Sequence, residues 1–143
     1  MIVTFCGHGN ILSGKDEIRK KVAEEVENLI KNGAKEFLLG GYGDFDHMCA
    51  GVVKELKAKY PHIKSVLVTA YLNSYFDKWL YDETEYPPIE KIPKRYAIIK
   101  RNEYMVDKSD IVVCYVKYDS GGAATTLKYA LKNNKTTINL YQS

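Results

Sequence analysis

Short apolar segments alternate with longer amphipathic segments along most of this chain, and this alternation restricts its fold more than any other feature. The apolar segments are nearly continuous, which is typical of strands buried on both faces of a parallel sheet. Right-handed crossovers then place helices on both faces, so the order predicts an α/β, Rossmann-like, doubly wound and mostly parallel sheet. The predicted strands are residues 2–6, 36–39, 63–70, 110–116 and 136–140, and the predicted helices are residues 15–32, 44–59, 101–108 and 123–133.

Residues 71–96 interrupt this alternation. They contain the single tryptophan and three of the four prolines of the chain. We expect a long irregular segment here, with one helical turn at residues 75–80. Segments of this kind usually serve a function in compact domains, and the alternative is a simple insertion. Because no linker or internal repeat is visible elsewhere, residues 1–143 are expected to form one domain.

Charge and cysteine content restrict the expected partners. The net charge is +3, and the lysines are spread among acidic residues along the whole chain, which disfavours a nucleic-acid partner. Cys6, Cys49 and Cys114 form no CxxC pair, so we expect neither a metal site nor a cofactor. The first predicted strand begins at residue 2 and leaves no signal peptide, and no apolar stretch is long enough to span a bilayer. The expected location is the cytoplasm, without membrane contact.

Glycine-containing turns follow three of the predicted strands and lead toward helices. These turns are residues 7–9, 40–43 and 120–122. In a parallel sheet they lie at the same edge, where α/β folds bind their ligands. A helix N-terminus presents unpaired N–H groups, and glycine lets a phosphate approach the backbone. The sequence therefore predicts a phosphate site, while the absence of GxGxxG and Walker patterns disfavours a nicotinamide dinucleotide or typical ATPase site.

The last of these turns carries the most polar groups. Ser120, Thr125 and Thr126 add hydroxyl groups to the backbone donors of this turn. These hydroxyls suit phosphate oxygens or a ribose, and their alternative role is helix capping, above all for Ser120. We expect Gly121, Gly122 and Thr125 to contact the ligand.

Several segments together resemble one known family. Residues 101–110 read RNEYMVDKSD and are followed by a predicted strand and by Ser120-Gly121-Gly122. This arrangement resembles the pattern of the YpsA-like branch of the SLOG superfamily, the group that contains the DprA and LONELY GUY proteins. Residues 4–8 (TFCGH) and 40–46 (GGYGDFD) are similar to further parts of the pattern, so the resemblance extends over nearly the whole chain.

The resemblance implies a Rossmann-like sheet and a nucleotide-related ligand, since relatives include phosphoribohydrolases and sensors of nucleotide signals derived from NAD. It implies that Arg101 contacts a phosphate, which suits its planar guanidinium. It also makes Asp46 and Asp107 candidates for ribose hydroxyls or internal capping, with the structural role favoured for Asp107. The predicted ligand-binding residues are Gly7, His8, Gly40, Gly41, Asp44, Arg101, Asn102, Ser120, Gly121, Gly122 and Thr125.

The sequence also departs from the family pattern. Gly9 stands where an arginine is usual, and Lys128 replaces the glutamate of the phosphoribohydrolase motif. Cleavage of an N-glycosidic bond normally needs a carboxylate near the developing oxocarbenium ion. The loss of this glutamate argues against that activity. Candidate substitutes are Asp44, Asp46 and Glu103, with His8 as an acid or base or, more simply, as a hydrogen-bond donor.

Three functional hypotheses follow. In the favoured one, the chain binds a nucleotide or an ADP-ribose-like molecule as a sensor or a sequestering protein, without catalysis. In the second, it is a nucleoside-monophosphate phosphoribohydrolase or a similar N-glycosidase. In the third, by analogy with the DNA-processing branch, it binds nucleic acid, which the scattered basic charge disfavours. A homo-oligomer, a dimer or larger, is expected because relatives of this fold often pair.

Overall fold

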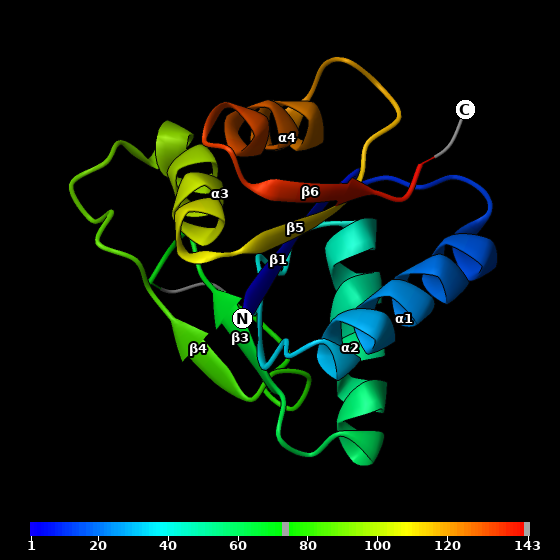
Figure 1. Ribbon diagram of the computed structural model, residues 1–143. Helices are drawn as coiled ribbons and strands as arrows, with labels where there is room; N and C mark the ends of the chain where they lie inside the picture. Colours follow the sequence, from blue (N-terminus) through cyan, green and yellow to red (C-terminus); the bar gives the residue numbers. More distant parts are fainter. Residues whose placement is uncertain (73–74, 142–143) are drawn as a thin grey trace.

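Figure 1 shows the computed structural model, which describes residues 1–72 and 75–141. Within these residues, six parallel strands form one sheet in the order β4-β3-β2-β1-β5-β6. The strands are β1 (Ile2–Gly7), β2 (Glu36–Leu39), β3 (Lys64–Val68), β4 (Glu83–Glu85), β5 (Ile111–Tyr115) and β6 (Thr136–Asn139). The helices are α1 (Lys15–Lys31), α2 (Asp44–Lys59), α3 (Ala97–Lys108) and α4 (Gly122–Lys132), with a 3-10 turn at Lys94–Tyr96.

Helices cover both faces of the sheet, with α1 and α2 on one face and α3 and α4 on the other (Figure 1). Phe5 of β1 belongs to a buried cluster that includes Val22 of α1 and Val52 of α2. On the opposite face, Val112 of β5 lies in a second cluster with Val106 of α3. Burial of apolar side chains on both faces explains the nearly continuous apolar strands. The predicted α/β, doubly wound architecture is confirmed.

The direction of the strand order reverses between β1 and β5. From β1 the sheet continues through β2 and β3 to one side, whereas β5 and β6 lie on the other side. β1 and β5 pair in register, with Cys6 opposite Cys114 and Gly7 opposite Tyr115. The loops that follow these two strands leave in opposite directions and open a crevice at the carboxyl edge of the sheet. In open α/β sheets, this crevice is the usual place for a ligand.

Residues 71–96 contain a strand that the sequence did not predict. β4 pairs with β3 and forms one edge of the sheet. Its three residues, Glu-Thr-Glu, show no apolar alternation, because an exposed edge strand buries little surface. In place of a helical turn at residues 75–80, the chain forms one tight turn, closed by a hydrogen bond from the Leu80 N–H to the Asp77 carbonyl (3.1 Å).

The boundaries of the other elements differ from the prediction by a few residues, and α3 differs most. It begins at Ala97 rather than at residue 101. Its first turn contains Ile98 and Ile99, whose branched side chains have modest helix propensity and obscure the start. No helix in the described part of the chain is both long enough and apolar enough to cross a membrane.

Candidate functional site

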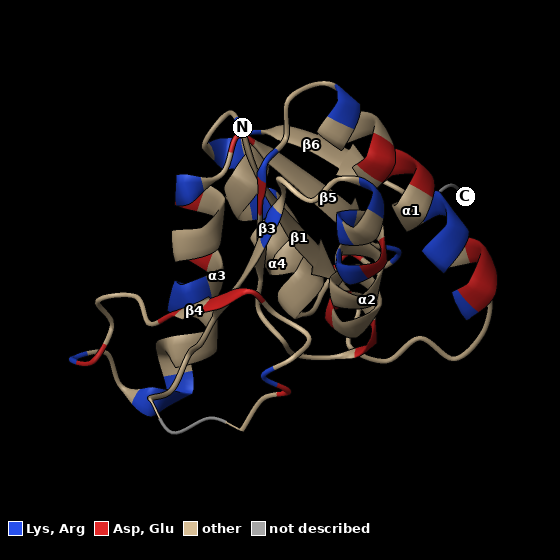
Figure 2. Ribbon diagram, turned by 90° about the horizontal axis from the view of Figure 1, so that it is seen from below, with Lys and Arg blue, Asp and Glu red and all other residues tan. Residues whose placement is uncertain are grey.

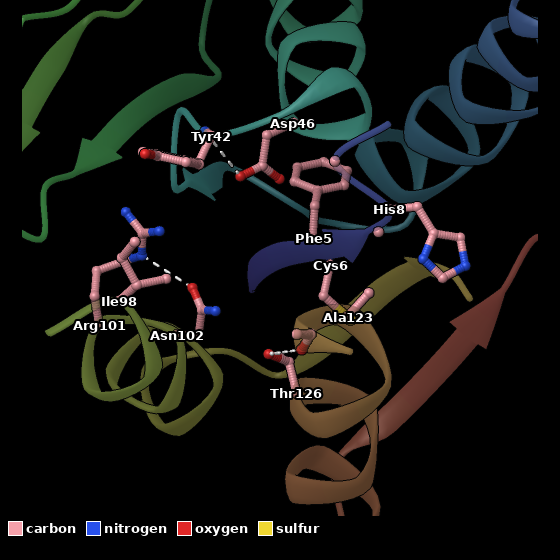
Figure 3. A pocket seen from close by; sticks show the side chains of 13 residues that line it. Phe5, Cys6, His8, Tyr42, Asp46, Ile98, Arg101, Asn102, Ala123 and Thr126 are labelled. Carbon is pink, nitrogen blue, oxygen red and sulfur yellow. Dashed lines mark hydrogen bonds between the residues drawn. The ribbon is translucent and has the colours of Figure 1, made fainter. Parts of the chain in front are cut away.

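A cavity of about 220 Å³ lies in the crevice between β1 and β5. Figure 3 shows side chains that converge on it from β1, from the start of α2, from α3 and from the start of α4. The cavity is therefore built from segments far apart in the sequence, as expected for a switch point. Its lining consists of Phe5, Cys6, Gly7, His8, Gly9, Tyr42, Asp46, Ile98, Arg101, Asn102, Gly122, Ala123 and Thr126.

The first turn of α4 presents its backbone to this cavity. No side chain caps this end of the helix, and Gly121 before it has φ +101°, a conformation that favours glycine. A Cβ built on Gly122 meets no atom within 4 Å, so the missing side chain leaves open space beside the backbone. The N–H groups of this turn and the helix dipole favour an anion here.

The glycines at the end of β1 and directly after β2 have a packing role instead. A Cβ on Gly7 would lie 2.3 Å from a ring carbon of Phe45, and a Cβ on Gly40 would lie 2.9 Å from an Asp46 carboxylate oxygen and 3.0 Å from Cζ of Arg101. A side chain at Gly7 would overlap the Phe45 ring, and one at Gly40 would force the Asp46 and Arg101 side chains to move. The absence of side chains at Gly7 and Gly40 therefore makes room for protein groups around the cavity.

The N-terminus of α2 is closed by the protein itself. The Asp44 N–H donates to the Gly9 carbonyl (2.9 Å), and the Phe45 N–H donates to the His8 carbonyl (3.3 Å). The Asp44 side chain accepts a hydrogen bond from the Ile11 N–H (2.8 Å), which lowers the pKa of this carboxyl. Asp44 thus holds the loop between β1 and α1. It lines a separate cleft with the start of α1, and the residue at the N-cap of α2 is Gly43.

Arg101 is almost fully buried, with 3% of its surface exposed. Its Nη1 donates to the carbonyls of Gly40 (2.8 Å) and Val68 (3.0 Å), and its Nε donates to Oδ1 of Asn102 (2.9 Å). The guanidinium therefore ties together the carboxyl ends of β2 and β3. Among the described residues, no hydrogen-bond partner is found for Nη2, and Arg101 lines both this cavity and a smaller one of about 110 Å³ beside it.

Asn102, like Arg101, uses one of its polar atoms within the protein and leaves another without a partner among the described residues. Its Oδ1 accepts the hydrogen bond from Arg101, which fixes the orientation of the amide. Its Nδ2 group donates to none of the described residues and lies at the junction of the main cavity with a second cleft between α3 and α4. Asn102 and Arg101 together leave N–H donors on the α3 side of the cavity.

Asp46 supplies the carboxyl group of the cavity. It accepts a weak hydrogen bond from the Tyr42 N–H (3.4 Å) (Figure 3). Burial raises its pKa from 3.8 to about 6, and the positive charge of Arg101 opposes this rise only in part. Asp46 therefore holds a proton more readily than an ordinary aspartate, within reach of neutral pH.

His8 lies at the other end of the cavity, beside the rings of Tyr115 and Tyr118. Its Nε2 accepts a hydrogen bond from the Lys117 N–H (2.7 Å). Burial, with a smaller contribution from Lys117, lowers the pKa of the imidazole. A neutral ring that accepts at Nε2 carries its proton on Nδ1, so this histidine is set up as a hydrogen-bond donor.

The remaining predicted residues lie around the cavity rather than in it. Gly41 lines the smaller cavity next to Arg101, and Glu103 and Thr125 line the cleft between α3 and α4. Ser120 is exposed in the loop before α4, and it is not one of the described residues that line these three spaces. The predicted residues that the structure brings together in the main cavity are Gly7, His8, Asp46, Arg101, Asn102 and Gly122.

Sequence reasoning did not select several residues of the lining. Phe5 and Cys6 directly precede Gly7 at the end of β1, and Thr126 follows Gly122 by one helical turn. Ile98 precedes Arg101 and Asn102 by about one turn on α3. Helical spacing around the selected residues was the available signal for Thr126 and Ile98. The described residues contain no group of three or more His, Cys, Asp or Glu side chains placed to hold a metal ion.

Comparisons with known proteins agree with this architecture. The chain is 26% identical over 140 residues to the SPbeta prophage-derived protein YoqJ of Bacillus subtilis, and the match covers 81% of each chain. Among solved structures, it superposes with a TM-score of 0.69 on DNA processing protein A from Helicobacter pylori at 18% identity, covering 100% of this chain and 66% of that one. It also superposes on the Moco carrier protein of Chlamydomonas rheinhardtii with a TM-score of 0.59 at 15% identity, covering 97% and 74%.

These structural likenesses show a shared fold. The family assignment has a separate basis, because the model of the YspA SLOG family (YpsA) matches residues 13–142. This range includes α3, both glycine turns after β2 and β5, and every strand except β1. The chain belongs to the YspA SLOG family.

Proposed function

We propose that this protein binds a phosphate-bearing, nucleotide-like small molecule in the cavity between β1 and β5, as a sensor or sequestering protein. The observation that carries this proposal is the excess of unused donors around one cavity. The backbone of the first α4 turn, Nη2 of Arg101, Nδ2 of Asn102 and Nδ1 of His8 all border it. Hydrogen bonds from such groups to an anion are about twice as strong as neutral ones.

The arrangement of these donors suits a phosphate with an attached sugar. The uncapped α4 turn and the open space at Gly122 favour the phosphate. Asp46 lies across the cavity and is an acceptor that suits hydroxyl groups, such as those of a ribose. Because Arg101 and Asn102 are already held by the protein, their donors need little reordering when a ligand binds.

N-glycosidase activity is the second candidate, and Asp46 is the observation that favours it. A carboxyl with a pKa of about 6 can act as a general acid near neutral pH. Glycosidases, however, normally use two carboxyl groups, and Asp46 is the single carboxylate among the described residues of the lining. Lys128, at the position of the family glutamate, donates to the Asp119 carbonyl (2.9 Å) and does not line the cavity. Binding without turnover is therefore favoured, which agrees with the carrier role in the name of the Chlamydomonas relative.

Nucleic acid is a less favourable partner. Figure 2 shows basic residues interspersed with acidic ones along α1 and α2 rather than gathered on one face. Many of the cations form ion pairs within the protein, which lowers the positive potential available to a phosphate backbone. The paired cations include Lys15, Arg19, Lys57, Lys59, Lys64, Lys100 and Lys108.

Filling the open space at Gly122 is expected to weaken ligand binding strongly while leaving the fold intact. In a Gly122→Val variant, the added side chain occupies the place proposed for the phosphate, and α4 tolerates valine at its first position because nothing lies within 4 Å. The loss of charge-assisted hydrogen bonds corresponds to about 10- to 100-fold weaker affinity. Calorimetry with AMP and with ADP-ribose measures this loss, and chromatography of the recovered ligand distinguishes binding from cleavage.

Leu131→Val is the control, because it introduces the same residue at the exposed far end of α4, away from the cavity. It is expected to bind like the parent protein. Ligand recovered intact supports a sensor or sequestering protein, whereas release of free base establishes the N-glycosidase. Equal affinity of the Gly122→Val variant and the parent would contradict the proposed phosphate position.

A further inference from the structure

A second cleft, of about 200 Å³, lies between α3 and α4 and opens beside the candidate site. Ile98, Asn102, Gly122 and Thr126 line both spaces, so the two adjoin at the start of α4. No side chain at Gly122 separates them. A molecule bound at the α4 turn can therefore extend into this cleft.

The walls of the cleft are mostly apolar. Ile98 and Ile99 form the α3 side, and the ring of Tyr129 belongs to the α4 side. The Tyr129 hydroxyl donates to a carboxylate oxygen of Asp107 (2.8 Å), which fixes the ring and raises the pKa of the phenol to about 12. Ile99 remains 44% exposed, so this apolar surface is not filled by the protein's own side chains.

The hydroxyl groups of the two threonines in the cleft already donate hydrogen bonds to backbone carbonyls at the start of α4. The Thr125 hydroxyl donates to the Gly121 carbonyl (3.0 Å), and the Thr126 hydroxyl donates to the Gly122 carbonyl (3.0 Å). Their protons are therefore not available to a ligand in this conformation, and the cleft offers contact area rather than directed donors. Glu103, at the α3 rim, is paired with Lys100 (3.2 Å). A flat, weakly polar group suits such a cleft better than a phosphate or a sugar does.

We infer that the α3–α4 cleft binds the planar heteroaromatic base of the ligand, while the phosphate lies at the start of α4. This inference rests on the proposed function and identifies the ligand class as a nucleotide rather than a sugar phosphate. Isoleucine side chains on one side and a fixed tyrosine ring on the other enclose the base. Asn102 lines both spaces, and its Nδ2 group, which donates to none of the described residues, is the candidate donor to the group that links base and phosphate.

The test compares AMP with ribose 5-phosphate, which lacks the base, by calorimetry on the full chain. Thr125→Phe fills the cleft from an exposed position, and Ile99→Ser removes apolar surface from its other side. The parent protein is expected to bind AMP at least tenfold more tightly than ribose 5-phosphate. Thr125→Phe is expected to remove this advantage, Ile99→Ser to reduce it, and both to change ribose 5-phosphate affinity less than twofold.

Lys132→Phe, exposed at the far end of α4, is the control and is expected to bind both probes like the parent. Equal affinity of the parent for the two probes would overturn the base site while leaving the phosphate site intact. The same conclusion would follow if Thr125→Phe weakened neither probe, or both equally. Failure of the parent to bind either probe would instead refute the proposed function, and the base site with it.

Discussion

Replacement of Arg101 by methionine is expected to lower the free energy of unfolding by about 2–4 kcal/mol, a large part of the stability of a domain of this size. The variant loses the hydrogen bonds that join the carbonyls of Gly40 and Val68. It also removes the positive charge that favours the ionised form of Asp46. Methionine replaces part of the buried volume, so the loss of polar contacts dominates over the loss of packing. Urea denaturation monitored by circular dichroism measures the change.

Lys100→Met is the matched control for this prediction. Lys100 is the preceding residue on α3, its side chain is 47% exposed, and among the described residues it pairs with Glu103 on the same helix. Its loss is expected to change stability by less than about 0.5 kcal/mol. An Arg101→Met variant as stable as this control would show that the guanidinium does not hold the ends of β2 and β3 together.

Replacement of Asp46 by asparagine is expected to stabilise the protein by about 1–3 kcal/mol at pH 7.5 and by almost nothing at pH 3.5. The folded-state pKa of about 6 exceeds the ordinary value of 3.8. Between these values the folded protein binds a proton that the unfolded chain has lost, so the contribution of Asp46 to stability falls as pH rises. The upper limit of about 3 kcal/mol follows from the size of this shift, and partial exposure of the side chain reduces it.

Other carboxyl groups, such as those of Asp44 and Glu85, have lowered pKa values and act in the opposite direction. The informative quantity is therefore the difference between Asp46→Asn and the parent, measured by urea denaturation at pH values from 3.5 to 7.5. Asp119→Asn, an exposed change in the loop before α4, is the control for the removal of one carboxylate at the surface. A stabilisation independent of pH would exclude proton binding by Asp46 as its cause. If Asp46 serves a ligand, its carboxyl group is expected to destabilise the fold at neutral pH, because residues at functional sites often lower stability.

The sequence predicted most of the fold because its signals are local. Buried strands such as β1 and β5 read as continuous apolar segments, and α1 repeats apolar residues at helical spacing. β4 could not be predicted in this way, since its three residues carry no apolar pattern and its place in the sheet depends on pairing with β3. Its assignment requires knowledge of the neighbouring strand.

The site was predicted less completely, because its contacts join distant segments. The position of Gly122 followed from the glycine turn before α4, and the structure places its backbone at the cavity. The sequence did not indicate that Arg101 would use its Nη1 on two backbone carbonyls, or that Lys117 would donate to His8. It also did not distinguish Asp44, which holds a loop, from Asp46, which faces the cavity. A single residue separates these carboxylates, and only the direction of α2 decides which one points inward.

Nuclear magnetic resonance of ¹⁵N-labelled protein, titrated in turn with AMP and with ADP-ribose, tests the central claim most directly. The Gly122 and Ala123 amides lie at the uncapped start of α4 and line the cavity. We expect their signals to shift in a saturable manner, together with the side-chain amide of Asn102. Shifts confined to the cleft of Asp44 and His47, or an absence of saturable shifts with both ligands, would contradict the assignment of this cavity as a nucleotide site.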